Sequence, residues 1–295
     1  MAAAAPVIEI PAPHDTVAAK IVRAIARGPV HIVLIVLGLA WLVPTIGLFI
    51  TSILPASVDA SSGWWTIFSH PSLATWANYH ALFKNAGLVT ALKTTAYIAV
   101  GNTLLVVVLG AMAGYAFAWL DFPGRDWFFI GVIGLLVVPL QMALIPMFKL
   151  YDTFGLFDTW EGIALFHVAF GLPFAIFLLR NFFVGLPKDI LESARIDGAN
   201  EIVIFLRLIL PLGLPAIASL AIFQFLWTWN DLLVALTFGQ NTTPITVWIA
   251  GQLREFGSSI DIIAPASFIS LVIPLAVFLA FQRYFVQGLL AGSVK

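Results

Sequence analysis

One charged stretch, Leu186 to Pro215, separates long apolar runs of this 295-residue chain, and its residue types suit contact with another protein. Lys188 and Glu192 stand four residues apart, so on a helix they share one face. Gly198 suits the left-handed position just past a helix end, which predicts two short helices that meet at the Asp197-Gly198 pair. The small residues Ala194 and Gly198 leave a surface that a second protein can approach closely. The alternative is an ordinary charged loop between two membrane helices.

The order of residues in this stretch resembles the EAA loop of the permease subunits of binding-protein-dependent ABC importers. Eight positions carry the likeness and are implied to couple the chain to a cytoplasmic ATPase: Glu192, Ser193, Ala194, Asp197, Gly198, Ala199, Phe205 and Pro211. Ser193 stands where the family pattern has a second alanine, which exchanges one small residue for another. The ordered set at family spacing makes an ordinary loop a poor explanation.

Two further segments narrow the resemblance to the carbohydrate branch. Trp229-Asn230-Asp231 and the C-terminal segment Gln282 to Lys295 are similar to the maltose-type sugar permeases. The resemblance covers nearly the whole chain after residue 29. It implies the type I ABC importer permease fold, a second permease subunit in a heterodimer, and two cytoplasmic ATPase subunits that bind the ATP and Mg²⁺. It also implies an extracytoplasmic sugar-binding protein that delivers an oligosaccharide or α-glucoside.

Polar and aromatic side chains recur within the apolar stretch 212–236. At helical spacing they fall on one face: Gln224, Trp227, Thr228 and Asp231. Polar groups inside a membrane are costly, so this face is expected to turn to the bundle interior or to a water-filled path. Amide and carboxylate groups bind sugar hydroxyls, and an aromatic ring covers the apolar face of a sugar. The candidates for the substrate path are Gln224, Trp227, Asn230, Asp231 and Gln141.

The sequence leaves two roles open for several of these residues. Asn230 and Asp231 either contact the substrate or stabilise a helix end or the interface with a partner subunit. Gln141, beside Pro139, has the same two open roles. His167 lies in another apolar stretch, where a hydrogen bond between helices is expected. A proton relay is the alternative, but relays need several ionisable groups in line.

No catalytic or cofactor-binding motif is visible, so the chain is not expected to be an enzyme. It has no Gly-x-x-x-x-Gly-Lys-Ser/Thr phosphate loop, so ATP is expected on a separate subunit. The five histidines show no His-Glu-x-x-His spacing, and the absence of cysteine excludes thiolate metal sites. A membrane-embedded enzyme would need clustered acid, base or metal-binding residues. A secondary carrier would favour an inverted repeat with carboxylates inside the membrane, and no clear repeat is found.

Composition indicates an all-α integral membrane protein. Hydrophobic residues make up 61% of the chain and charged residues 10%, against about 25% charged residues in soluble domains. The net charge of −1 argues against a nucleic-acid partner, which needs a clustered basic excess. Six stretches reach the length of about 20 apolar residues that a spanning helix needs. They are residues 30–54, 97–120, 127–150, 162–183, 212–236 and 262–285.

The distribution of lysine and arginine predicts the orientation, because these residues favour the cytoplasmic side. With the N-terminus inside, ten of the fourteen fall inside and four outside, so both termini are expected in the cytoplasm. Residues 1–29 then form a cytoplasmic tail before a permease domain, residues 30–295, in a bacterial or archaeal inner membrane. The coupling loop 185–212 is internal, and the segments 55–93 and 237–265 are external. The second external segment is either a solvated connector or, as the resemblance implies, a contact for the binding protein.

Overall fold

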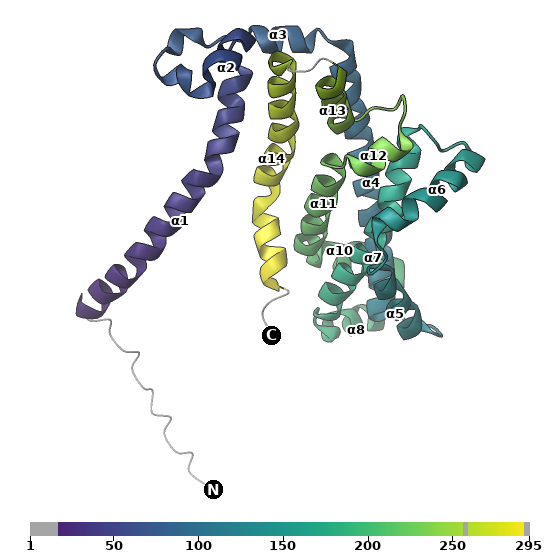
Figure 1. Ribbon diagram of the computed structural model, residues 1–295. Coiled ribbons are helices and arrows are strands. Elements are labelled where there is room, and N and C mark those ends of the chain that lie inside the picture. Colours follow the sequence, from purple (N-terminus) through teal and green to yellow (C-terminus); the bar gives the residue numbers. More distant parts are fainter. Residues whose placement is uncertain (1–16, 256–258, 292–295) are drawn as a thin grey trace.

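The computed structural model describes residues 17–255 and 259–291, and every secondary-structure element in these two ranges is a helix (Figure 1). Parts of three predicted segments lie outside the described residues: 1–16 of the tail, 256–258 of the second external segment and 292–295 at the C-terminus. Four helices are long and apolar enough to cross a membrane by themselves. They are α1 (Val17–Ser52), α4 (Ala86–Trp119), α7 (Trp160–Val184) and α14 (Ile260–Ala291).

A sharp bend interrupts the helix predicted over residues 127–150. Helix α5 (Arg125–Leu135) and helix α6 (Leu140–Phe154) meet at 98°. Pro139 precedes α6 in an extended conformation and has no N–H to continue the hydrogen bonding of α5. The two helices are long and apolar enough to cross a membrane only when they are taken together.

A second bend lies between the coupling loop and the helix that follows it. The segment Glu201–Leu212 meets α11 (Leu214–Trp229) at 75°. The continuous helix predicted over residues 212–236 is also interrupted, because α11 ends at Trp229 and the chain resumes as α12 (Leu233–Phe238). If each bent pair counts as one span, the described residues contain up to six crossings. The loop itself consists of α8 (Lys188–Ile196), α9 (Glu201–Ile204), the π-helical turn η3 (Phe205–Ile209) and α10 (Leu210–Leu212).

Short helices gather at the end of the molecule opposite to α8, at the top of Figure 1. They are α2 (Ala56–Ser62), the 3₁₀ turns η1 (Trp64–Phe68) and η2 (Pro71–Leu73), α3 (Ala77–Phe83) and α13 (Ile245–Glu255). Helix α3 leads directly into α4. Asn85 joins the two, because its side-chain oxygen accepts a hydrogen bond from the backbone N–H of Gly87 at 2.9 Å and caps α4.

Helices α4 and α7 pack closely where α4 carries two glycines four residues apart. A Cβ atom added to Gly110 would lie 2.7 Å from the Cβ of Ala175, and one added to Gly114 would lie 3.0 Å from the Cβ of Leu179. Both distances are shorter than ordinary contacts, so only glycine lets the two backbones approach this closely. Small residues at this spacing are typical of tightly packed membrane helices.

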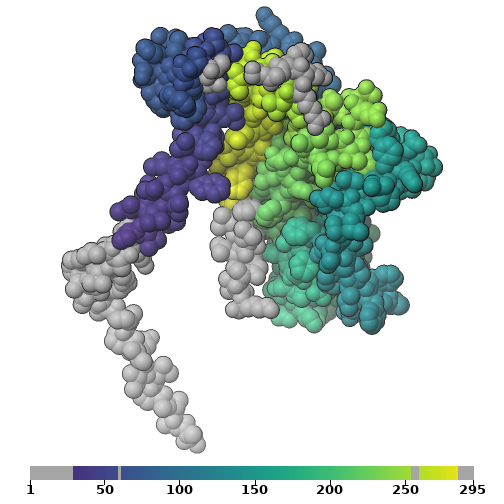
Figure 2. Space-filling model, viewed as in Figure 1, coloured from purple at the N-terminus to yellow at the C-terminus, as the bar shows by residue number. Residues whose placement is uncertain are grey.

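Helix α1 stands apart from the rest of the chain (Figures 1 and 2). The apolar side chains from Val30 to Val43 are exposed on all sides, and Trp41 is 81% exposed. From Val30 onward, α1 is buried against its own chain towards its C-terminal end, where the ring centroids of Phe49 and Phe268 are 4.9 Å apart. The first turns of α1 and the last turn of α14 lie at the same end of the molecule as α8 (Figure 1).

Candidate functional site

The predicted pair of short helices is present in the coupling loop, and a regular hydrogen-bonded turn joins them. Gly198 has φ +82°, in the left-handed region that the sequence predicts for it. Its N–H donates to the carbonyl of Arg195 at 3.0 Å, and the N–H of Ala199 donates to the carbonyl of Ala194 at 3.0 Å. These two bonds form a Schellman motif, which satisfies the last carbonyls of α8. The turn therefore fixes the direction in which the chain leaves α8.

The second half of the loop begins with a side-chain cap and ends at a proline. The side-chain oxygen of Asn200 accepts a hydrogen bond from the N–H of Val203 at 2.9 Å and starts α9. The π-helical turn η3 directly precedes the short helix that contains Pro211. In a regular α-helix the proline ring would clash with the carbonyl of Arg207, and a wider turn relieves such a clash.

One face of the coupling loop is buried in the core of its own chain. Leu191, Ile204 and Ile209 are fully buried. They belong to one apolar cluster with Leu179 and Phe183 at the end of α7. Displacing α8 would therefore disturb the packing of a membrane-spanning helix.

The opposite face of the loop is open. Glu192 is exposed, and its carboxylate has no hydrogen bond or ion pair within the described part of the chain. Ile196 and Ile202 are 85% and 70% exposed, a large apolar exposure for two residues at a polar end of the molecule. Sequence reasoning missed both isoleucines. For Ile196 the signal was its position outside the apolar stripe of the amphipathic helix α8.

The eight predicted coupling residues do not all lie on this open face. Glu192, Ser193, Asp197, Gly198 and Pro211 are exposed. Ala194, Ala199 and Phe205 are half-buried and pack against the core of the chain. The ring of Phe205 lies 5.4 Å from the ring of Tyr115 on α4, so this residue faces its own subunit.

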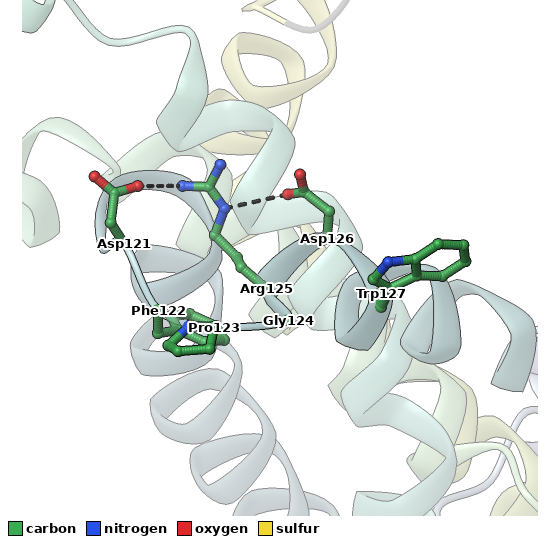
Figure 3. A pocket seen from close by; sticks show the side chains of 7 residues that line it. All are labelled: Asp121, Phe122, Pro123, Gly124, Arg125, Asp126 and Trp127. Carbon is green, nitrogen blue, oxygen red and sulfur yellow. Dashed lines mark hydrogen bonds and ion pairs between the residues drawn. The ribbon is translucent and has the colours of Figure 1, made fainter.

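The turn between α4 and α5 lies at the same end of the molecule and pairs its one arginine with two aspartates (Figure 3). Arg125 pairs with Asp121 at 3.0 Å and with Asp126 at 3.2 Å. Gly124 has φ +80°, which allows the tight Pro-Gly turn. Both acids are largely exposed, so this open pocket offers no buried group that could hold a ligand.

The structure places Gln224 inside the helix bundle. It is 4% exposed, and its Nε2 donates to the side-chain oxygen of Asn102 on α4 at 3.2 Å. Asn102 in turn donates to the hydroxyl of Thr228 at 2.6 Å. The side chain of Gln224 also fills the space beside Gly171 of α7. Within this chain, Gln224 and Thr228 therefore hydrogen-bond α11 to α4.

Asp231 does not share a helix face with Gln224, because α11 ends before it. Its carboxylate accepts hydrogen bonds from the backbone N–H groups of Val234 at 3.3 Å and Ala235 at 3.0 Å. Its backbone carbonyl accepts a bond from the hydroxyl of Thr246 at 2.5 Å. Asp231 thus stabilises a helix end, one of the two roles that the sequence left open.

His167 is fully buried on α7, and within the described ranges it does not make the predicted hydrogen bond to another helix. Its Nδ1 bonds to the carbonyl of Ile163 in the same helix at 2.9 Å. Its Nε2 has no hydrogen-bond partner among the described residues and lies 3.7 Å from Asp231 Oδ2. The rings of Trp227 and His167 lie edge to face, with the centroids 5.0 Å apart.

The other path candidates are accessible. Trp227 is 39% exposed, and Asn230 and Gln141 are exposed. Asn230 donates from Nδ2 to the carbonyl of Leu226 at 2.8 Å, which leaves its side-chain oxygen as an acceptor. Together with Thr246 and residues of α14 it lines an open, mainly apolar groove of about 670 Å³ between α11, α13 and α14.

One carboxylate, that of Asp158, organises two loops. Asp158, with φ +59°, follows α6 and accepts at Oδ1 from the backbone N–H groups of Gln240, Asn241 and Thr242 at 2.7 to 2.9 Å. Asn241 also donates to Oδ2 through its side chain at 2.6 Å. Although partial burial raises the pKa of Asp158, the hydrogen bonds from Thr242, Asn241 and Gln240 lower it below its ordinary value.

Replacing Asp158 with Ala is expected to free the loop 239–243, because three backbone donors lose their acceptor. Limited proteolysis should cut this loop about tenfold faster, which corresponds to a loss of roughly 1.4 kcal/mol. Asp158→Asn keeps an acceptor and tolerates the left-handed backbone, so it should be cut more slowly than the alanine variant. Asp152→Ala, at an exposed position on α6, is the matched control. Equal cleavage of all three variants would contradict the role of Asp158.

The lowered pKa of Asp158 gives this contact a pH dependence. A depressed carboxyl pKa stabilises the fold above the unfolded value, 3.8, and that contribution is lost as the pH falls through the lower folded value. The loop should therefore stay protected from proteolysis at neutral and mildly acidic pH.

Comparison with known proteins identifies relatives over almost the whole chain. An osmoprotective compounds uptake permease protein of Synechocystis sp. is 45% identical over 273 residues, which cover 90% of this chain and 92% of that protein. An alpha-glucoside transport system permease protein of Rhizobium meliloti is 48% identical over 233 residues, 76% of this chain and 61% of that longer protein.

Solved structures share the fold. A chain of a bacterial ABC transporter involved in the import of the acidic polysaccharide alginate superimposes with a TM-score of 0.73 and 20% identity. The match covers 93% of this chain and all of the other. Residues 106–291, which include the coupling loop, match the model of the binding-protein-dependent transport system inner membrane component. The chain is therefore a helical membrane protein and belongs to this family of transport permeases.

Proposed function

We propose that this chain is one transmembrane half of an ATP-driven ABC importer for sugars. It crosses a bacterial or archaeal inner membrane six times, with each bent helix pair counted as one crossing and both termini in the cytoplasm. The coupling loop carries the proposal, because one of its faces is packed into the core while Glu192, Ile196 and Ile202 leave the other face open. A second, related permease subunit completes the path.

Two cytoplasmic ATPase subunits bind ATP and Mg²⁺ and dock on the open face of α8. When they close on ATP, they push α8, and the buried face of the loop passes this movement to α4 and α7. A path that is open to the outside then becomes open to the inside. Such coupling needs two states with different contacts at the interface, and the exposed face of α8 supplies one set of contacts.

The substrate is an oligosaccharide or α-glucoside that a soluble binding protein delivers to the outer loops. The names of relatives support this class, since one of them is an alpha-glucoside permease. Trp227, Asn230 and Gln141 are accessible and remain the candidates for contact with the sugar. Membership of a transport permease family makes a secondary carrier or a membrane-embedded enzyme a poorer explanation.

Replacing Glu192 with Ala is expected to weaken docking of the ATPase. The carboxylate is exposed and has no partner within the described residues, so its removal costs the subunit itself little. Loss of one charged hydrogen bond at an interface corresponds to about tenfold weaker binding. The measurement is recovery of the ATPase with the purified permease. Glu161→Ala, an exposed acid at the first turn of α7, is the matched control and should leave recovery unchanged. Undiminished recovery with Glu192→Ala would contradict the docking role.

A further inference from the structure

An ion pair bridges the turn between the two helices of the coupling loop. Arg195, in the last turn of α8, donates from Nε to Glu201 Oε1 at 2.9 Å and from Nη2 to Oε2 at 3.4 Å. Glu201 is the first residue of α9. The pair therefore spans the Asp197-Gly198 turn from the core side and ties the end of one helix to the start of the next.

The same pair is anchored to the end of a membrane-spanning helix. The hydroxyl of Tyr115 on α4 donates to Glu201 Oε2. Arg195 Nη2 also donates to the backbone carbonyl of Trp119, the last residue of α4, at 3.3 Å. Trp119 in turn donates from its indole N–H to the carbonyl of Phe183 on α7 at 3.0 Å. One continuous series of hydrogen bonds thus connects α8 and α9 with α4 and α7.

The burial of these groups indicates a role in positioning. Tyr115 is 4% exposed, whereas the side chains of Arg195 and Glu201 are 38% and 42% exposed. A half-exposed ion pair contributes little to stability. A guanidinium that donates twice to one carboxylate is strongly directional, however, and fixes the angle between the elements that carry it. Within the described residues, no other ion pair involves the coupling loop.

We propose that Arg195 and Glu201, held by Tyr115, form the linkage through which movement of α8 reaches α4 and α7. This inference rests on the proposed function, in which the ATPase pushes α8. The apolar contacts of Leu191 and Ile204 keep the loop attached to the core, but apolar packing alone lets a short helix rock or slide. The ion pair makes α8, α9 and the end of α4 move as one body.

Removing either charge should lower the number of sugar molecules imported per ATP hydrolysed. The experiment uses the complete importer in proteoliposomes, with Arg195→Gln, Glu201→Gln and the double variant. Each single variant should lower the uptake per ATP by about tenfold, within the range of measured coupling between sites. The double variant should cost no more than either single one, because both singles break the same linkage. Arg207→Gln, at an exposed position in the same loop, should leave the ratio unchanged.

The ratio separates this role from a merely structural one, because a variant that folds poorly reduces the amount of complex and not the uptake per ATP. If the glutamine variants do not accumulate, Tyr115→Phe tests the linkage instead. This variant removes a single hydroxyl and should lower the uptake per ATP about threefold. Unchanged ratios, additive losses in the double variant, or an equal loss with Arg207→Gln would overturn the linkage. Failure of the proposed function gives a different result, because the unaltered complex would then show no ATP-driven uptake.

Discussion

Replacing Gly110 with Leu is expected to prevent α4 and α7 from packing and to remove most of the folded subunit from the membrane. A Cβ atom at this position already lies 2.7 Å from the Cβ of Ala175, and the nearby backbone of Ala175 leaves no flexible side-chain end to move aside. A leucine adds three further carbons at the same point. Overpacking of a close helix contact costs about 3 kcal/mol, a large part of the stability of most proteins. The measurement is the fraction of subunit that elutes as a single species in detergent.

Gly131 on α5 provides the matched control for this substitution. A Cβ atom there meets nothing within 4 Å, so Gly131→Leu should leave the elution profile and the thermal unfolding midpoint close to those of the unaltered chain. Both substitutions exchange a helical glycine in an apolar helix for leucine. If Gly110→Leu proved as well folded as Gly131→Leu, the two helices would not depend on this close approach.

Replacing Gly198 with Val is expected to leave the subunit inserted but to abolish most sugar uptake. The residue has φ +82°, and a β-branched side chain is strained in this region by about 2 kcal/mol or more. The easiest relief is to open the turn, which changes the angle between α8 and α9. Uptake per ATP hydrolysed should therefore fall at least about tenfold, as measured in proteoliposomes.

Gly198→Asn distinguishes strain from crowding. A Cβ atom at Gly198 meets nothing within 4 Å in this chain, so no clash inside the subunit contributes to the effect. Asparagine tolerates the left-handed region, and a loss caused by strain should be largely recovered with it. If asparagine is as harmful as valine while the turn is intact, the ATPase itself must lie against Gly198. Normal uptake by the valine variant would contradict the coupling role of the turn.

Local signals explain why much of the coupling loop was predictable. Gly198 ends α8 in the left-handed conformation because its neighbours in sequence supply both hydrogen bonds of the turn. The long apolar stretches likewise predict α1, α4, α7 and α14 from composition alone. Neither inference needs to know which parts of the chain meet in space.

The interruptions in the predicted spans depend on tertiary structure and were not predictable in the same way. Apolar residues resume directly after Asn230-Asp231. Helix α11 nevertheless ends at Trp229, where Asp231 caps α12 and its carbonyl binds Thr246 of a later helix. Gln224 has its partner, Asn102, 122 residues away in sequence. A polar residue in an apolar stretch therefore indicates that it has a polar partner. The sequence does not identify that partner as a sugar or as another helix.

Packing within this subunit does not select particular apolar residues in helix α1 between Val30 and Val43. Its side chains touch little of their own chain, so exchanging leucine, isoleucine and valine among these positions opens no cavity and forces no overlap within the subunit. A hydrocarbon environment rewards apolar area without requiring a particular shape. The contacts within this chain therefore allow the sequence of this helix to change rapidly during evolution, provided that its length and hydrophobicity are kept.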